Sequence, residues 1–244
     1  MLEVRDLQVA YGAAPALWGV SLSVQPGELL CVVGPNGAGK TTLINTLAGI
    51  LRARSGQIRF EGREMTALAP HRFCEAGIAR TYQIPRPFGH MSVLDNVALA
   101  TMFGGAVKSP VEARRQAMSW LEFTGLIEKA NARPDDLNLH QRKFLELARA
   151  LASRPRVVLL DEVLCGLTPS EIDDAVALIR RIRDQGATIV FVEHVMRAVM
   201  ALTDRIVVFN HGELLAEGRA SDVMQRPEVM TAYLGRPQLE PAHA

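Results

Sequence analysis

Apolar and polar residues alternate along the first part of the chain. Residues 2–4, 7–9 and 20–24 place apolar side chains at every second position, which is the pattern of a strand with one buried face. Residues 29–33 are apolar throughout, as expected for a strand buried on both faces. Residues 57–60 are a further short strand candidate. These strands predict a small N-terminal antiparallel β subdomain beside a buried core strand.

The middle of the chain has a helical pattern. A helix is predicted over residues 40–51, a strand over 78–83 and a mostly helical segment over about 84–153. Within that segment, the periodicity predicts helices over 111–124 and 139–153. This stretch is therefore expected to form an α-helical subdomain.

Strands and helices alternate again in the last third. Residues 157–160, 188–192 and 206–209 read as strands that are separated by helical stretches. Such alternation is typical of an α/β fold with a mostly parallel core sheet. We expect one domain over residues 1–235 and a flexible tail over 236–244.

Composition narrows the possible classes of protein. The 27 basic and 26 acidic residues among 244 give a formal charge of +1, so nothing calls for a nucleic-acid partner. Cys31, Cys74 and Cys165 are isolated from one another, which favours reduced core thiols. The N-terminus lacks the apolar stretch and the small-residue cleavage site that are typical of a signal peptide, and no apolar run reaches the length of a membrane span. The chain is expected to be soluble by itself.

A phosphate-binding motif follows the buried strand. Residues 34–41, Gly-Pro-Asn-Gly-Ala-Gly-Lys-Thr, fit the pattern G-x-x-x-x-G-K-[ST]. Glycines let backbone N–H groups curl around phosphate oxygens, and the following helix N-terminus adds a favourable dipole. Lys40 is expected to reach the β- and γ-phosphates and Thr41 to ligate Mg²⁺. A chance glycine-rich turn is disfavoured, because the motif stands between a strand and a helix.

Two acids and a histidine follow later strands. Asp161 and Glu162 end the strand over 157–160, where Asp161 can hold Mg²⁺ and Glu162 can orient and deprotonate water. His194 follows the strand over 188–192 and can contact the γ-phosphate region. Each of these side chains can instead be an ordinary solvated group at a strand end. Their position beside a phosphate loop favours the functional interpretation.

Two further positions have open interpretations. Gln83 is either a polar residue at a strand end or a neutral Mg²⁺ ligand that senses a partner. Tyr11 either packs in a strand or stacks on adenine.

Together these motifs resemble the ABC transporter ATPases, over about residues 1–235. The resemblance identifies a P-loop NTPase fold, ATP and Mg²⁺ as cofactors, and ATP hydrolysis coupled to transport. It implies Glu162 and His194 as catalytic residues, and Thr41, Gln83 and Asp161 as Mg²⁺ ligands. The ATP-binding residues that it implies are Tyr11, Gly34, Pro35, Asn36, Gly37, Ala38, Gly39, Lys40, Thr41 and Thr42.

Residues 77–100 and 192–218 are more narrowly similar to the ATP-binding subunits of high-affinity branched-chain amino-acid importers. That similarity implies a second ATPase subunit, two transmembrane permease subunits and, indirectly, a periplasmic solute-binding protein. It also implies a place at the cytoplasmic face of the cell membrane. Residues 84–88, Ile-Pro-Arg-Pro-Phe, are either a surface that receives a permease's cytoplasmic helix or a buried Pro-rich loop.

One motif departs from the family pattern. The family signature Leu-Ser-Gly-Gly-Gln corresponds here to Leu137 followed by Asn138, Leu139, His140 and Gln141. In the family this segment faces the γ-phosphate bound by the opposite subunit, so the bulkier side chains predict a heterodimer with one weakened ATP site. The basic clusters, including Arg142 and Lys143, are expected to be solvated helix faces.

Three other functions remain open on the residues alone. A soluble ABC-type ATPase is disfavoured by the single ATP domain and the near-neutral charge. A regulatory nucleotide binder with little turnover is compatible with the altered signature, although Glu162 and His194 argue against it. A small-molecule kinase would need an acceptor motif that the sequence does not contain.

Overall fold

The computed structural model describes residues 1–104 and 107–234. Its centre is a six-stranded sheet with the strand order β10-β9-β3-β8-β7-β6. The strands are β3 (Leu29–Val33), β6 (Ile78–Arg80), β7 (Val157–Asp161), β8 (Thr188–Val192), β9 (Arg205–Asn210) and β10 (Glu213–Gly218). All neighbours pair in parallel except β10, which pairs with β9 in antiparallel fashion. The predicted parallel core sheet is confirmed.

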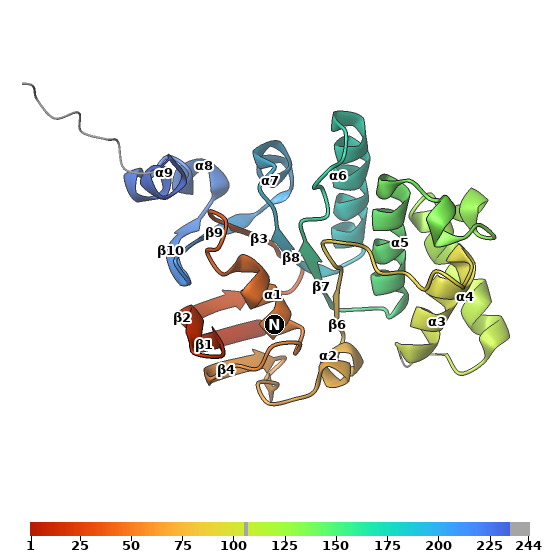
Figure 1. Ribbon diagram of the computed structural model, residues 1–244, viewed down its shortest axis with the longest axis horizontal. Coiled ribbons are helices and arrows are strands. Elements are labelled where there is room, and N and C mark those ends of the chain that lie inside the picture. The colour runs from red at the N-terminus through yellow and green to blue at the C-terminus, as the bar shows by residue number, and fades with distance from the viewer. Residues whose placement is uncertain (105–106, 235–244) are drawn as a thin grey trace, which may run out of the picture.

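A second sheet covers one side of this core. It has the order β2-β1-β4-β5 with antiparallel pairing throughout. Its strands are β1 (Leu2–Tyr11), β2 (Ala14–Val24), β4 (Ser55–Phe60) and β5 (Arg63–Glu64). Figure 1 shows this sheet beside α1 (Lys40–Leu47), and α2 (Pro70–Ala76) leads back to the core. The predicted antiparallel subdomain is therefore present, with the two first strand candidates merged into one strand.

The helical segment forms a layer at the far side of the core from the second sheet (Figure 1). It contains α3 (Val93–Phe103), α4 (Pro110–Phe123), α5 (Leu139–Ala152) and 3₁₀ turns at Ile127–Lys129 and Pro134–Asp136. The Ser92 side chain accepts a hydrogen bond from the Asp95 amide and caps α3, which fixes where that helix begins.

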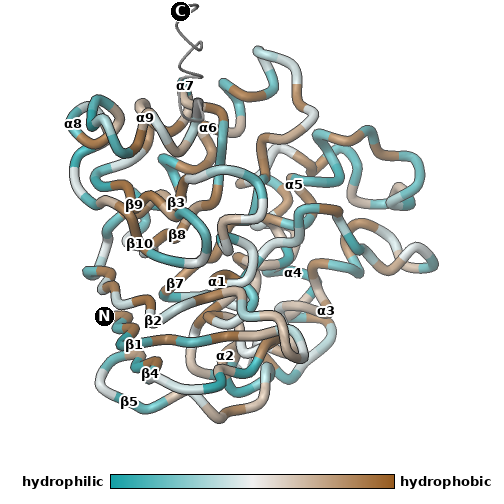
Figure 2. Tube along the Cα trace, turned by 60° about the vertical axis from the view of Figure 1, so that its left-hand side comes forward, coloured by the Kyte–Doolittle hydropathy of each residue, from teal (hydrophilic) through white to brown (hydrophobic). Residues whose placement is uncertain are grey.

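The alternation of side chains along the core strands divides the interior in two. In β3, Leu30 and Val32 face α1 and the antiparallel sheet, whereas Leu29, Cys31 and Val33 face the helices on the other side. Figure 2 shows hydrophobic residues concentrated on these central strands. Because both faces are covered, the core strands carry apolar residues at nearly every position.

The remaining helices complete the domain. They are α6 (Pro169–Asp184), α7 (Met196–Leu202), α8 (Ala220–Val223) and α9 (Pro227–Leu234). Thr168 caps α6 in a capping box with Glu171, as its spacing predicts. No helix among the described residues is long and apolar enough to cross a bilayer. The tail expected over 236–244 lies outside the described residues.

Several element boundaries differ from the predictions; for example, β2 begins at Ala14 rather than at residue 20. Two further differences lie next to the phosphate loop and the sheet edge. The strand predicted over residues 78–83 ends at Arg80, and residues 81–83 lie in an irregular segment. The first helix ends at Leu47 rather than at residue 51. In the first case, β6 ends where its partner β7 still continues, so that the chain turns away from the sheet and carries Gln83 over its edge.

Candidate functional site

Residues 34–39 connect β3 to α1 through three glycines with positive φ angles. These are Gly34 (146°), Gly37 (78°) and Gly39 (101°), a region of backbone space that favours glycine. A Cβ atom at Gly34 would lie 2.2 Å from the carbonyl oxygen of Phe209 in β9. The loop therefore curls tightly against the sheet, as a phosphate-binding loop requires.

Lys40 begins α1 with its ammonium group turned back into this loop. Its Nζ donates to the carbonyl oxygens of Gly34 at 2.8 Å and Pro35 at 2.9 Å. Burial lowers the pKa of Lys40, and the nearby carboxylates of Glu162 and Asp161 oppose that shift. The predicted lysine and the two predicted acids are therefore close together.

A cavity of about 350 Å³ opens in front of the loop. Tyr11, which ends β1, stands at its edge with 52% of its surface exposed, and its hydroxyl lies 3.4 Å from Thr42 Oγ1. An exposed aromatic face at this position can stack on a planar base. The lining residues are Tyr11, Pro15, Ala16, Asn36, Gly37, Ala38, Gly39, Lys40, Thr41, Thr42 and Glu162.

Asp161 lies at the end of β7 and is buried. Its Oδ1 accepts a hydrogen bond from Thr41 Oγ1 at 3.5 Å, and its Oδ2 lies 3.5 Å from the guanidinium of Arg80. Burial raises the pKa of Asp161, and Arg80 is the main opposing influence. Asp161 and Thr41 can therefore offer oxygen ligands on the same side of the loop, as Mg²⁺ prefers.

Glu162 and Gln83 meet at the edge of the sheet. Glu162 has a positive φ of 49°, so the chain turns sharply after Asp161. Its carboxylate accepts a hydrogen bond from Gln83 Nε2. In this structure Gln83 thus contacts the predicted catalytic acid, and its segment reaches this acid because β6 is short.

His194 follows β8 at the same sheet edge. Val192 pairs with Asp161, and His194 comes two residues later, with its imidazole exposed to solvent. The His194 amide donates to the carboxylate of Glu193 at 3.1 Å. The structure therefore brings His194 to the predicted edge.

The altered signature residues start α5. Asn138 and Gln141 form a capping box, in which each side chain accepts from the other residue's amide. The His140 ring packs on Phe144, with centroids 4.0 Å apart, whereas Leu139 is 45% exposed and lies against Gly166. Of the two bulky replacements, only Leu139 projects outward. None of these residues lines the cavity of the phosphate loop.

Sequence reasoning missed three residues near the site and misjudged one thiol. Lys143 was expected on a solvated face but is only 5% exposed, because α5 turns it toward Glu162. The other two missed residues are Arg80 and Glu193. Arg80 is a charged residue within a predicted strand and Glu193 directly follows one, and these positions could have identified them. Cys31 is buried as predicted, whereas Cys165 is exposed, so the expectation of core thiols is wrong there.

The chain is similar to known proteins along most of its length. Residues 17–164 match the family model described as ABC transporter. The ATP-binding protein BraF for high-affinity branched-chain amino acid transport in Pseudomonas aeruginosa is 38% identical, with 96% of this chain and 98% of that protein covered. LivG of Escherichia coli, which bears the same description, is 35% identical with the same coverage.

Solved structures show the same fold. A nucleotide-free ATP-binding cassette from an ABC transporter has a TM-score of 0.86 and 30% identity, with 96% of this chain and 99% of that chain covered. A cassette in its ADP conformation has a TM-score of 0.84 and 30% identity, with 98% of that chain covered. The chain has the family's fold, and it belongs to the ABC transporter family of ATPases.

Proposed function

We propose that this chain is the ATP-hydrolysing subunit of an importer for branched-chain amino acids or related small polar solutes. The observation that carries the proposal is the meeting of Lys40, Thr41, Asp161 and Glu162 around one loop, with Tyr11 across the cavity. The substrate class is supported by the descriptions of BraF and LivG, which match along nearly their whole length. A soluble ABC-type ATPase is not favoured, because these relatives are transport subunits.

The chain's own residues divide the chemistry between them. Backbone N–H groups within residues 34–41, other than that of Pro35, which has none, and the Lys40 ammonium bind the β- and γ-phosphates. Glu162 orients and deprotonates the attacking water, and Gln83 holds the Glu162 carboxylate by its hydrogen bond. His194 contacts the γ-phosphate from the neighbouring strand end, and Tyr11 stacks on adenine.

The residues around Asp161 fit a magnesium ion. Mg²⁺ usually takes one or two protein oxygens beside phosphate oxygens and water, and Thr41 and Asp161 provide such a pair, with Gln83 as a neutral ligand nearby. When bound, the ion neutralises negative charge on the phosphates.

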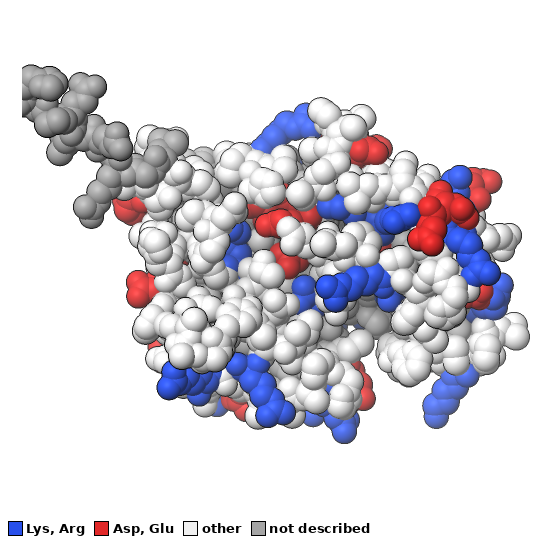
Figure 3. Space-filling model, in the orientation of Figure 1, with Lys and Arg blue, Asp and Glu red and all other residues white. Residues whose placement is uncertain are grey.

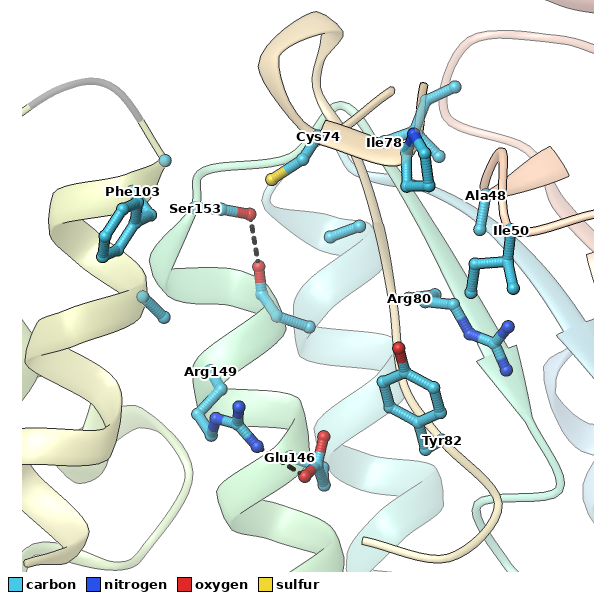
Figure 4. Close-up of a pocket in the computed structure, with 15 residues that line it drawn as sticks. Ala48, Ile50, Cys74, Ile78, Arg80, Tyr82, Phe103, Glu146, Arg149 and Ser153 are labelled. Carbon is cyan, nitrogen blue, oxygen red and sulfur yellow. Dashed lines mark hydrogen bonds and ion pairs between the residues drawn. The ribbon is translucent and has the colours of Figure 1, made fainter. Parts of the chain in front are cut away.

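Surface features of the chain support the proposed contact with a permease subunit. A groove of about 290 Å³ runs between the core and the helical segment, and Figure 4 shows Tyr82 and Arg80 facing Glu146 and Arg149 across it. Ile84 beside it is 71% exposed, and the segment is braced because the Arg86 amide donates to Glu146 at 2.7 Å. This groove, with residues 84–88, is the surface for a permease's cytoplasmic helix, whose movement would follow ATP-driven closure.

The assembly that we propose is a heterodimer of ATPase subunits with two permeases and a periplasmic binding protein, at the cytoplasmic face of the membrane. The departure at Leu139 and His140 supports unequal ATP sites. Figure 3 shows acidic and basic side chains interspersed over the face in view, with no single-sign surface there for nucleic acid.

The direct test is ATP-dependent uptake of labelled leucine, isoleucine or valine by proteoliposomes that contain the purified complex and its binding protein. Uptake that needs ATP supports the proposal, whereas uptake of none of the three excludes branched-chain amino acids as the substrates. For the groove, a crosslinker at Phe88→Cys should capture a permease, and the same reagent at Arg63→Cys on the antiparallel sheet should not. Absence of a crosslink along residues 84–88 contradicts the docking surface.

A further inference from the structure

Lys143 is a buried ammonium group outside the phosphate loop. It lies on α5, two residues after Gln141, and is 5% exposed. Its Nζ donates to the backbone carbonyl oxygen of Glu162 at 3.1 Å. Burial lowers the pKa of Lys143, and the nearby Cys165 thiol and the Glu193 and Glu162 carboxyl groups oppose the shift. Burying a charged group costs free energy unless a hydrogen bond or an opposite charge compensates it. The hydrogen bond to the Glu162 carbonyl oxygen therefore stabilises Lys143 in its buried position.

The partner of Lys143 is a backbone turn in an unusual conformation. Glu162 has a φ of 49°, a left-handed conformation that is unfavourable for a residue with a Cβ atom and persists only when its surroundings hold it. Its amide donates to the Val192 carbonyl oxygen at 2.9 Å, and its own carbonyl oxygen accepts from Lys143. The backbone of Glu162 is therefore held from both sides, by β8 and by α5.

Glu193 connects the two loops that follow β7 and β8 at this edge of the sheet. It is 1% exposed, and its Oε1 accepts from the Leu164 amide at 2.7 Å. Its Oε2 accepts from the His194 amide at 3.1 Å and the Val195 amide at 3.4 Å. One buried carboxylate thus joins the loop that follows Glu162 to the loop that carries His194.

We propose that Lys143 and Glu193 are positioning residues for ATP hydrolysis. Lys143 fixes the backbone of Glu162 so that its carboxylate faces the phosphate loop, and Glu193 keeps the His194 loop in register with it. Neither side chain needs to touch ATP. The inference rests on the proposed roles of Glu162 and His194.

Helix α5 also connects the altered signature segment to Glu162. Asn138 caps the N-terminus of α5, in the segment proposed to face the partner's nucleotide, and Lys143 lies in the second turn of the helix. A displacement of this helix at its N-terminus therefore changes the support of Glu162. Lys143 is thus a direct physical link between the partner-facing segment and this chain's own hydrolytic acid.

The test compares steady-state ATP hydrolysis by assembled complexes that carry single substitutions. Lys143→Met should lower kcat at least tenfold and leave the KM for ATP within twofold, because phosphate binding by the loop is untouched. Lys143→Arg, which keeps a buried cationic donor, should retain at least half of the wild-type kcat. Lys129→Met, the same change at an exposed lysine of the helical segment, should leave kcat unchanged. Glu193→Gln should lower kcat, again with little change in KM.

A double substitution separates positioning from general destabilisation. Because Lys143 acts through Glu162, adding Lys143→Met to Glu162→Gln should cause no further loss of single-turnover hydrolysis. A multiplicative loss, or a wild-type kcat in Lys143→Met, overturns the inference. If Lys143→Met does not fold, as judged by thermal unfolding, Lys143→Gln takes its place with the same expectations. A Glu162→Gln complex with normal turnover would instead remove the proposed role of Glu162 itself, which is a distinguishable failure.

Discussion

The guanidinium of Arg80 lies 3.5 Å from the carboxylate of Asp161, and the two side chains are only 10% and 2% exposed. Arg80 is held in place from its other side, because its Nη1 donates to Asn45 of α1. Its guanidinium also lies 4.6 Å from the centre of the Tyr82 ring. Asp161 therefore has Arg80 as a fixed counter-ion at one carboxylate oxygen and Thr41 as a hydrogen-bond donor at the other. Arg80 also lines the groove between the core and the helical segment.

Removal of this counter-ion should destabilise the fold. Arg80→Gln leaves Asp161 buried without its cation, which costs about 3 kcal/mol of unfolding free energy. Arg72→Gln is the matched control, because Arg72 pairs with Glu75 on an exposed face, where a salt bridge contributes about 0.5 kcal/mol. Urea denaturation of the nucleotide-free subunits measures both values. Equal effects from the two substitutions would mean that the Arg80–Asp161 pair has no special role in stability.

Glu193 should make stability depend on pH. Burial raises the pKa of Glu193, and its backbone hydrogen bonds only partly oppose this. A carboxyl group whose folded-state pKa is raised contributes stability that is fully present below its unfolded pKa of about 4.3 and is lost as the pH rises through the folded value. The stability of the wild type relative to Glu193→Gln should therefore fall as the pH rises above about 4.3. A difference that grows over this range would show that the fold favours the charged carboxylate instead.

The loop glycines should differ in their tolerance of a methyl group. Gly34→Ala brings a Cβ atom to 2.2 Å from the Phe209 carbonyl oxygen and should cost about 3 kcal/mol. At Gly37 the added Cβ has no atom within 4 Å, so Gly37→Ala should cost only about 1 kcal/mol for its positive φ. Thermal unfolding of the two variants decides, and a Gly37→Ala variant at least as unstable as Gly34→Ala would contradict the geometry.

The two bulky residues of the altered signature should behave differently. Leu139 projects outward, so Leu139→Gly should raise ATP turnover by the assembled complex if this segment faces the partner's phosphate. His140 packs on Phe144, so His140→Gly should lower the Tm by about 2–4 °C, the cost of about 1 kcal/mol for glycine in a helix, and leave turnover unchanged. Increased turnover in His140→Gly alone would reverse this assignment.

Much of the fold could be predicted because it depends on local patterns. Strands of five residues that are apolar at all positions, as in β3, or at all but one, as in β8, are characteristic of a sheet covered on both faces. The phosphate loop marks the junction of β3 and α1. The position of Asp161 and Glu162 near this loop could also be predicted, because both acids lie at the end of a parallel strand and the carboxyl ends of parallel strands lie at the same edge of the sheet.

The residues that were missed depend on tertiary contacts. Lys143 stands in a basic run that looks solvated, and only the approach of α5 to the turn at Glu162 buries it. The end of β6 at Arg80 could not be read from the apolar pattern, because the chain leaves the sheet for a contact between Gln83 and Glu162 that is distant in sequence. The periodicity of apolar residues predicts which face of a helix or strand is buried. It does not predict which polar or charged side chains will form contacts with residues that are distant in sequence.

The central claim is that Glu162 activates water for hydrolysis of ATP bound by residues 34–41 of this chain. Phosphate release by the assembled complex with Glu162→Gln here, and with an unaltered partner ATPase subunit, tests it most directly. We predict that turnover falls by about 10² to 10⁴, the usual cost of losing a general base, while ATP still binds. Turnover near the wild-type rate would contradict the claim and assign hydrolysis to the partner's site.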